Sequence, residues 1–185
     1  MQNSSAFQKR LQKIFGTLGI ALDFPQRRSL VIIPEPYGII ERVEYCIDNE
    51  FHLLVPTAAK AWHTMAKAAL EDKVELLCVS GFRSVQRQAE LIEMRLAKDE
   101  SIDDILTHAA PPGYSQHHSG MCIDICSPDC PNVWEKDFSQ TTAFAWLKAN
   151  SEKFGWVNTM TPSNRWGYIY EPWHYYFNPP AELMP

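Results

Sequence analysis

The sequence lacks an excess of positive charge. Its 185 residues include 17 Lys and Arg against 22 Asp and Glu, which gives a net charge of −5. A chain without a basic field has little to attract the phosphates of nucleic acid or an anionic membrane surface. This argues against a nucleic-acid partner, and the content of 45% hydrophobic and 21% charged residues is typical of a globular protein.

The chain also lacks an apolar run of the roughly 20 residues that cross a bilayer. Near the N-terminus, Lys9, Arg10 and Lys13 precede an apolar stretch over residues 14–24, as in a signal peptide. However, Asp23 and two glycines interrupt this stretch, and no small-residue cleavage site follows. We therefore expect no transmembrane segment. The default location is the cytoplasm, and the cell envelope stays open if another route exports the protein.

None of the five cysteines forms a Cys-x-x-Cys pair with another. An odd number of cysteines without that spacing argues against a complete disulfide framework and against a thiolate zinc site. In a reducing compartment all five thiols would stay free. In an oxidising one, Cys126 and Cys130, which flank a Ser-Pro-Asp segment, could form a disulfide, and the sequence leaves this alternative open.

The apolar pattern predicts an α+β fold, with an antiparallel sheet and helices packed on one side. Residues 1–40 are expected to form an N-terminal arm with a short amphipathic helix, and residues 41–185 the main domain. Expected in that domain are an extended pair over 43–55, helices over 58–70, 84–97 and 141–154, and strands over 76–79, 121–125 and 169–177. Thr57 and Ser84 are expected to cap the first two of these helices. Because helices and strands do not alternate regularly, an antiparallel sheet is favoured.

Three potential metal ligands stand out, namely His117, Asp124 and His174. The first two flank Gly120 in the segment SQHHSGMCID, and the third closes the segment EPWH. Two imidazoles and one carboxylate suit zinc and leave a fourth position for water. Glu171, three positions before His174, is the free carboxylate that a metal-dependent hydrolase needs as a base. The pattern therefore indicates a zinc hydrolase of the peptidase type.

Together, Ser-x-His-x-x-Gly-x-x-x-Asp and Glu-x-Trp-His resemble the signature of the VanY-type zinc D-alanyl-D-alanine carboxypeptidases. These enzymes are relatives of the VanX dipeptidases and of phage L-alanyl-D-glutamate endopeptidases. The resemblance covers about residues 50–178 and includes SGFRS at 80–84, Gln88, WL at 146–147 and FGW at 154–156. It implies a hedgehog/D-Ala-D-Ala carboxypeptidase-like fold and Zn²⁺ as the cofactor. The implied partner is a peptidoglycan stem peptide or a D-Ala-D-Ala-type peptide.

The resemblance also implies roles for individual residues. His117, Asp124 and His174 would bind the zinc. Glu171 would be the general base, which takes a proton from the attacking water and passes it to the leaving amine. Arg83 matches the arginine of the family's upstream motif, and its guanidinium suits a developing oxyanion or a substrate carboxylate.

Three further residues are expected near the substrate. Gln88 and Ser115 match positions that the family uses there, and Trp173 is expected as a pocket wall. Structural alternatives stay open for each, because Gln88 could be a solvated helix residue, Ser115 a brace for the loop of His117, and Trp173 a core aromatic. Arg83 could likewise be an ion-pair residue at a strand-to-helix turn.

Two positions depart from the pattern of the family. Cys122 stands where a small residue such as Ala is usual. It could serve packing, or its thiolate could compete for the metal. Tyr175 follows His174 where the family commonly has a basic residue, and this difference bears on the substrate more than on the chemistry.

The leading hypothesis is a zinc carboxypeptidase, expected to be a monomer, that removes a C-terminal D-amino acid such as D-Ala from stem peptides. Within the enzyme class, the alternatives are an L-alanyl-D-glutamate endopeptidase and a D-Ala-D-Ala dipeptidase. A non-catalytic zinc-binding module, as in hedgehog-type domains, is the alternative from another class. The joint presence of Glu171, Arg83 and Gln88 favours an enzyme.

Overall fold

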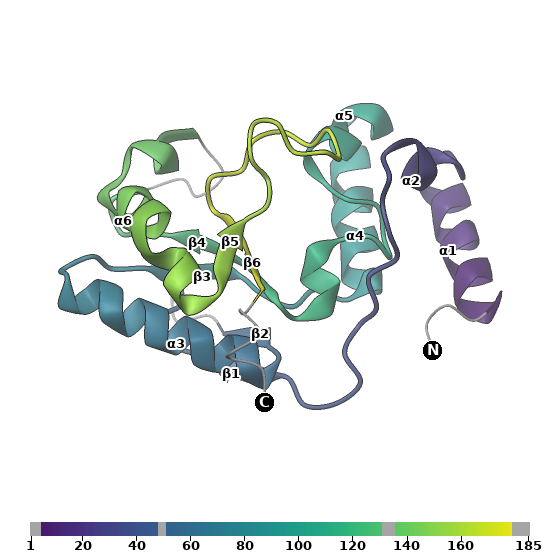
Figure 1. The fold of residues 1–185 in the computed structure, drawn as a ribbon. Coiled ribbons are helices and arrows are strands. Elements are labelled where there is room, and N and C mark those ends of the chain that lie inside the picture. The colour runs from purple at the N-terminus through teal and green to yellow at the C-terminus, as the bar shows by residue number, and fades with distance from the viewer. Residues whose placement is uncertain (1–4, 48–50, 131–135, 179–185) are drawn as a thin grey trace.

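A computed structural model describes residues 5–47, 51–130 and 136–178, and its centre is a four-stranded antiparallel sheet (Figure 1). The strand order is β3-β4-β6-β5, formed by Leu77–Ser80, Cys122–Cys126, His174–Phe177 and Trp156–Asn158. A smaller antiparallel pair joins β1 (Glu41–Val43) to β2 (His52–Leu54). This confirms the predicted α+β class and the extended pair, whose expected turn lies outside the described residues.

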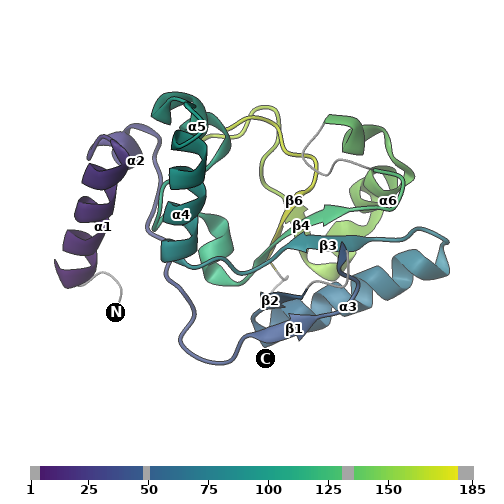
Figure 2. The ribbon, with the colours of Figure 1, turned by 180° about the vertical axis from the view of Figure 1, so that it is seen from behind.

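The helices lie beside and beneath this sheet (Figures 1 and 2). They are α1 (Ser5–Leu18), α2 (Phe24–Arg27), α3 (Pro56–Glu71), α4 (Val85–Leu96), α5 (Ile102–His108) and α6 (Thr142–Asn150). Among the described residues, 3₁₀ turns are η2 (Gln116–Ser119), η3 (Lys136–Gln140) and η4 (Ser151–Phe154). In the described part of the chain, no helix has both the length and the apolar character to cross a membrane.

Alternation along the central strands separates the core from the functional face. Ile123 of β4 and Tyr175 of β6 belong to the main hydrophobic core, together with the buried sides of α3 and α6. Asp124 and His174, which are partners across the same two strands, project from the opposite face, because successive side chains alternate. Helices α3 and α6 therefore cover one face, and the other face is free for a polar site.

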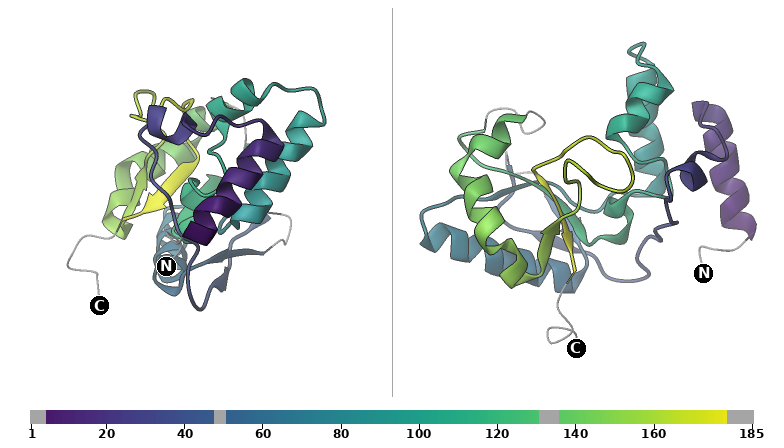
Figure 3. Two further views of the ribbon diagram at one scale, coloured as in Figure 1. Left: turned by 90° about the vertical axis from the view of Figure 1, so that its right-hand side faces the viewer. Right: turned by 45° about the horizontal axis from the view of Figure 1, so that its top comes forward.

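Helix α1 packs beside α4 rather than extending away from the molecule (Figure 3). Phe15 of α1 and Phe24 of α2 are buried in a second hydrophobic cluster with Ile92 of α4 and Ile105 of α5. The predicted amphipathic helix is thus present, and its apolar side faces the helices at the end of the sheet. The division into an arm of residues 1–40 and a catalytic domain of residues 41–185 stays a prediction.

The helix starts agree only partly with the predicted caps. Ser84 caps α4 as predicted, since its Oγ accepts a hydrogen bond of 3.0 Å from the backbone N–H of Arg87. The prediction for Thr57 was wrong, because α3 already begins at Pro56. Proline suits the first helical position, where its fixed φ is helical and its missing N–H would have no intrahelical partner.

The predicted closing strand over 169–177 was too long, since β6 begins at His174. Pro172 offers no N–H to a strand partner, and the N–H of His174 donates to the carbonyl of Glu171 in a turn, at 3.2 Å. The predicted helix over 141–154 is α6, which ends at Asn150 and continues as η4. Helix α5 and strand β5 were not predicted.

Candidate metal centre and active site

Asp124, His117 and His174 come together on the free face of the sheet, and all three are buried. His117 Nε2 lies 3.2 Å from Asp124 Oδ2, and His174 Nδ1 lies 3.1 Å from Asp124 Oδ1. The two imidazole rings stand edge to face, with their centroids 5.3 Å apart. The fold thus brings the SQHHSGMCID and EPWH segments to one centre.

The spacing of these donor atoms fits a single metal ion. In a tetrahedral zinc site with bonds of about 2.0–2.2 Å, two nitrogen or oxygen ligands lie about 3.3–3.6 Å apart. The two His–Asp separations, 3.2 and 3.1 Å, are slightly shorter than this. The residues present can therefore hold zinc with little movement of their side chains.

Hydrogen bonds fix which nitrogen of each imidazole is free. His117 Nδ1 lies 2.7 Å from the carbonyl oxygen of Gly81, and His174 Nε2 lies 2.9 Å from Gln116 Oε1. Each of these nitrogens therefore donates its N–H, and the other nitrogen of each ring, which faces Asp124, is the one that can bind a metal ion once it has lost its proton. Such partners orient the ligands of a metal site.

Gln116 is a site residue that the sequence did not reveal. Its Oε1 accepts from His174 Nε2 and also from the hydroxyl of Thr159, at 2.7 Å. Thr159 lies just after β5, so the contact links η2 to a distant segment. Because Gln116 occupies an unspecified position of the motif, no linear signal marks it, and only the fold shows that it orients His174.

Two glycines shape the backbone around His117. Gly81 must lack a side chain, because a Cβ would lie 2.6 Å from the carbonyl oxygen of Leu53. Gly120 has a φ of 67° in the left-handed region, where it ends η2 and lets the chain enter β4. Gly120 therefore lets the chain turn between His117 and Asp124, and Gly81 lets the segment after β3 lie against Leu53.

Glu171 lies beside the donor atoms, with its Oε2 3.6 Å from His174 Nδ1. Its backbone N–H donates to the carbonyl of Met160 at 3.0 Å, and its carbonyl accepts from Asn158 Nδ2 at 2.8 Å. Burial raises the pKa of this carboxyl to about 7. A group with that pKa can both accept and return a proton near neutral pH.

Asp124 is held ionised by its neighbours. Burial alone would raise the pKa of its carboxyl, but the imidazoles of His117 and His174 hold that pKa well below its usual range. For His117, burial alone would lower the pKa of the ring, and Cys122 and Asp124 raise it to about 9. The centre therefore supplies the carboxylate in the charged form that metal binding requires.

Arg83 lies next to this centre, just after β3. Its Nη2 is 3.9 Å from Asp124 Oδ2 and donates to the hydroxyl of Ser80 at 2.9 Å. Its Nη1 donates to Gln88 Oε1 at 3.0 Å. Gln88 is buried on α4 and donates to the carbonyl of Ala110 at 2.7 Å, so it is not a solvated helix residue. Its contacts instead hold the guanidinium of Arg83 in place.

A pocket of about 930 Å³ opens over the centre. The predicted site residues contribute to its wall, namely Arg83, Gln88, Ser115, His117, Asp124, Glu171, Trp173 and His174. Ser115 is buried just before η2, and its side chain caps none of the N–H groups of that turn. Trp173 lines the pocket and also belongs to the main core, so it is both a pocket wall and a core aromatic.

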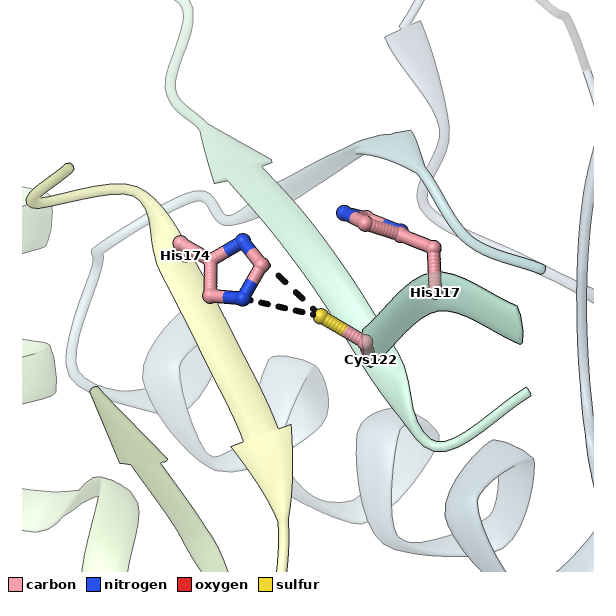
Figure 4. A group of neighbouring side chains, drawn as sticks. All are labelled: His117, Cys122 and His174. Atoms are coloured by element: carbon pink, nitrogen blue, oxygen red, sulfur yellow. Dashed lines mark hydrogen bonds between the residues drawn. The ribbon is translucent and has the colours of Figure 1, made fainter. Parts of the chain in front are cut away.

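Cys122 also reaches the centre (Figure 4). Its Sγ lies 3.3 Å from His174 Nε2, and its side chain is buried. Cys126 and Cys130 are buried as well, and neither forms a disulfide. The cysteine inside the motif is therefore more than a packing residue, since its sulfur lies among the donor atoms.

His118, next to His117, points away from the centre and is buried rather than exposed. Its Nδ1 donates to the carbonyl of Arg83 at 2.6 Å, and its Nε2 accepts from the N–H of Gly113 at 3.0 Å. Both bonds can form only with a neutral ring, because a proton on Nε2 would face another donor. Burial accordingly lowers the pKa of His118 to about 4.

Because His118 is neutral in the folded protein, we expect the protein to lose stability in acid. Below about pH 6.5 the unfolded chain protonates His118 and the folded chain does not, so the free energy of unfolding falls as the pH drops toward 4. The expected loss is about 3 kcal/mol, measured by urea unfolding of the metal-free protein. In His118→Asn this contribution should be absent. Equal slopes against pH in both proteins would contradict the assignment.

Comparison with known proteins identifies the family. The family model VanY, described as D-alanyl-D-alanine carboxypeptidase, matches residues 51–180. YodJ of Bacillus subtilis (strain 168) is 30% identical over 143 residues, which are 74% of this chain and 51% of that protein. A D-alanyl-D-alanine carboxypeptidase of Enterococcus faecalis (strain ATCC 700802 / V583) is 27% identical over 118 residues, 58% of this chain and 42% of that protein. The chain thus spans about half the length of these relatives.

Solved structures agree with this relationship. The LdcB LD-carboxypeptidase superposes with a TM-score of 0.64 at 27% identity, covering 83% of this chain and 70% of that one. A mutant of the vancomycin-resistance D,D-pentapeptidase VanY in complex with Zn(II) gives 0.61 at 23% identity, over 81% and 88% of the two chains, and it supports the fold. Because the family model covers more than half of the sequence, this chain belongs to the VanY family of D-alanyl-D-alanine carboxypeptidases.

Proposed function

We propose that this protein is a zinc metallopeptidase that removes a C-terminal D-amino acid, such as D-Ala, from peptidoglycan stem peptides. One observation carries the proposal, namely that Glu171 lies within 3.6 Å of a His–Asp–His donor set in the same pocket as Arg83. A non-catalytic metal module has no need for a further, mostly shielded carboxyl beside its ligands.

In this proposal, His117, Asp124 and His174 hold the zinc ion. When bound, zinc supplies a Lewis acid that polarises the peptide carbonyl and makes water a better nucleophile. Glu171 accepts the proton of the attacking water and then returns it to the leaving amine. Its carboxyl lies 3.6 Å from His174 Nδ1, which places it beside the donor atoms where both proton transfers would occur.

Arg83 is proposed to bind the terminal carboxylate of the peptide. Its guanidinium is held by Ser80 and Gln88 at the wall of the pocket, where its fork can donate two parallel hydrogen bonds. Support for a peptide ending in D-Ala comes from a related structure, VanYB, which was solved in complex with D-alanine-D-alanine. A cation beside the catalytic base favours cleavage next to a free chain end over cleavage inside a peptide.

Substitution of Arg83 tests this role. Arg83→Lys keeps the charge but loses the fork, so KM for a stem peptide with a free carboxylate should rise about tenfold or more. The native enzyme should discriminate against the same peptide with a C-terminal amide, and the variant should lose this discrimination. The matched control is Arg87→Lys, on the exposed side of α4. If kcat falls and the discrimination persists, Arg83 acts on the oxyanion instead.

The products of hydrolysis test the function itself. Purified zinc-loaded protein is incubated with a tetrapeptide and a pentapeptide stem and with D-Ala-D-Ala, and the products are separated by mass spectrometry. Release of single D-Ala from a stem is the expected result. Release of L-Ala would identify an endopeptidase, cleavage of D-Ala-D-Ala alone would identify a dipeptidase, and no cleavage would favour a zinc-binding module. Each of these three results contradicts the proposal.

A further inference from the structure

We propose that Cys122 gives this metal centre a sulfur donor, so that thiophilic divalent ions such as Cd²⁺ bind through His117, Cys122 and His174. The inference rests on the proposed metal centre and adds a second donor set to it. It concerns a buried residue of the SQHHSGMCID segment that the proposed reaction does not use.

The sulfur is placed as a ligand would be. Cys122 precedes Asp124 by two residues on β4, so both side chains project from the same face of the sheet. The side chain of Cys122 is 0% exposed. One donor atom from each of His117, Cys122 and His174 can be chosen so that all three lie within 4.8 Å of one another. Figure 4 shows these three side chains beside one another.

The individual distances also fit. For metal–sulfur bonds of about 2.3 Å and metal–nitrogen bonds of about 2.0–2.1 Å, a tetrahedral site places sulfur and nitrogen about 3.5–3.6 Å apart. Nδ1 of His174, the nitrogen that Gln116 leaves free, lies 3.9 Å from Cys122 Sγ, which is slightly longer than this spacing. A small rotation of the imidazole or of the thiol is enough to bring sulfur and nitrogen to one ion.

The two donor sets share the histidines and differ in the third ligand. Asp124 offers oxygen beside Nδ1 of His174, and Cys122 offers sulfur on the side nearer to Nε2. Carboxylate oxygen suits hard ions such as Mn²⁺, and thiolate sulfur suits soft ions such as Cd²⁺. The identity of the ion therefore selects the set. When sulfur binds, the thiol proton leaves to solvent as the sulfur–metal bond forms, with no change in oxidation state.

Absorption spectroscopy tests the sulfur ligand without a mutation. Addition of Cd²⁺ to the metal-free full chain should produce a sulfur-to-metal charge-transfer band in the ultraviolet. Cys122→Ser should lose this band and lower the Cd²⁺ affinity about tenfold or more, and its Mn²⁺ affinity should change little. The matched control is Cys126→Ser, a buried cysteine two residues after Asp124 on the same strand, which should keep both the band and the affinity.

The outcomes separate this inference from the proposed function. If Cd²⁺ binds without a charge-transfer band, the sulfur ligand is overturned, and D-Ala release by the zinc-loaded protein still tests the carboxypeptidase independently. A band that survives in Cys122→Ser overturns the assignment to this cysteine. If neither Cd²⁺ nor zinc binds, the metal centre itself fails, and the inference fails with it.

Discussion

Glu171→Gln is expected to lower kcat for D-Ala release by about 10²–10⁴-fold, the usual contribution of a general acid–base. Gln has nearly the same shape as Glu, but its amide cannot accept and return a proton. The carboxyl of Glu171 lies 3.6 Å from His174 Nδ1, and hydrogen bonds hold the backbone of Glu171, so the substitution should leave the fold and the three proposed metal ligands in place.

Two measurements on this variant are needed together. Zinc affinity, from competition with a chromophoric chelator, should match that of the native protein, and the rate of D-Ala release should not. Glu152→Gln, an exposed position in η4, is the control and should retain both properties. A Glu171→Gln enzyme that hydrolyses the stem peptide at the native rate would rule out the proposed proton transfer.

The second large effect is expected at the metal ligands. His174→Ala removes one of the three donors and should weaken zinc binding by more than about 100-fold, since even the outer partners of metal ligands contribute 10–100-fold. Hydrolysis should disappear in parallel. The same chelator competition measures the affinity, and His63→Ala is the control, because His63 lies on α3 and accepts from the N–H of Glu44.

Gln116 gives a graded comparison at the same centre. Because Gln116 orients His174 without being placed to bind the metal, Gln116→Leu should weaken zinc binding by about 10–100-fold, less than His174→Ala does. If Gln116→Leu has no effect, its hydrogen bond does not fix the ring. If His174→Ala still binds zinc with native affinity, the predicted ligand set is wrong.

The residues that the structure brings together were largely visible in the sequence, because the chemistry sits in two short linear segments. His117 and Asp124 are close in the chain, and Glu171 and His174 are separated by one turn. Asp124 and His174 share one face of the sheet because side chains alternate along a strand, and this alternation can be read from the sequence. For this reason the sheet and the donor positions could be predicted together.

What the sequence did not reveal depends on tertiary contacts. The hydrogen bond from His174 to Gln116 joins segments that only the fold brings together, and no spacing marks it. The position of Cys122 Sγ beside His174 depends on the pairing of β4 with β6. The early start expected for β6 came from Ile169 and Tyr170, because β-branched and aromatic residues indicate burial as readily as they indicate a strand.

The central claim is that hydrolysis depends on a metal ion bound at this centre. Chelator-treated protein is titrated with zinc while D-Ala release from a stem peptide is followed. The predicted result is a rate that starts near zero, rises linearly and stops rising at one equivalent of zinc per chain. A chelated protein that already releases D-Ala at the full rate, or a rate that zinc does not restore, would contradict the account.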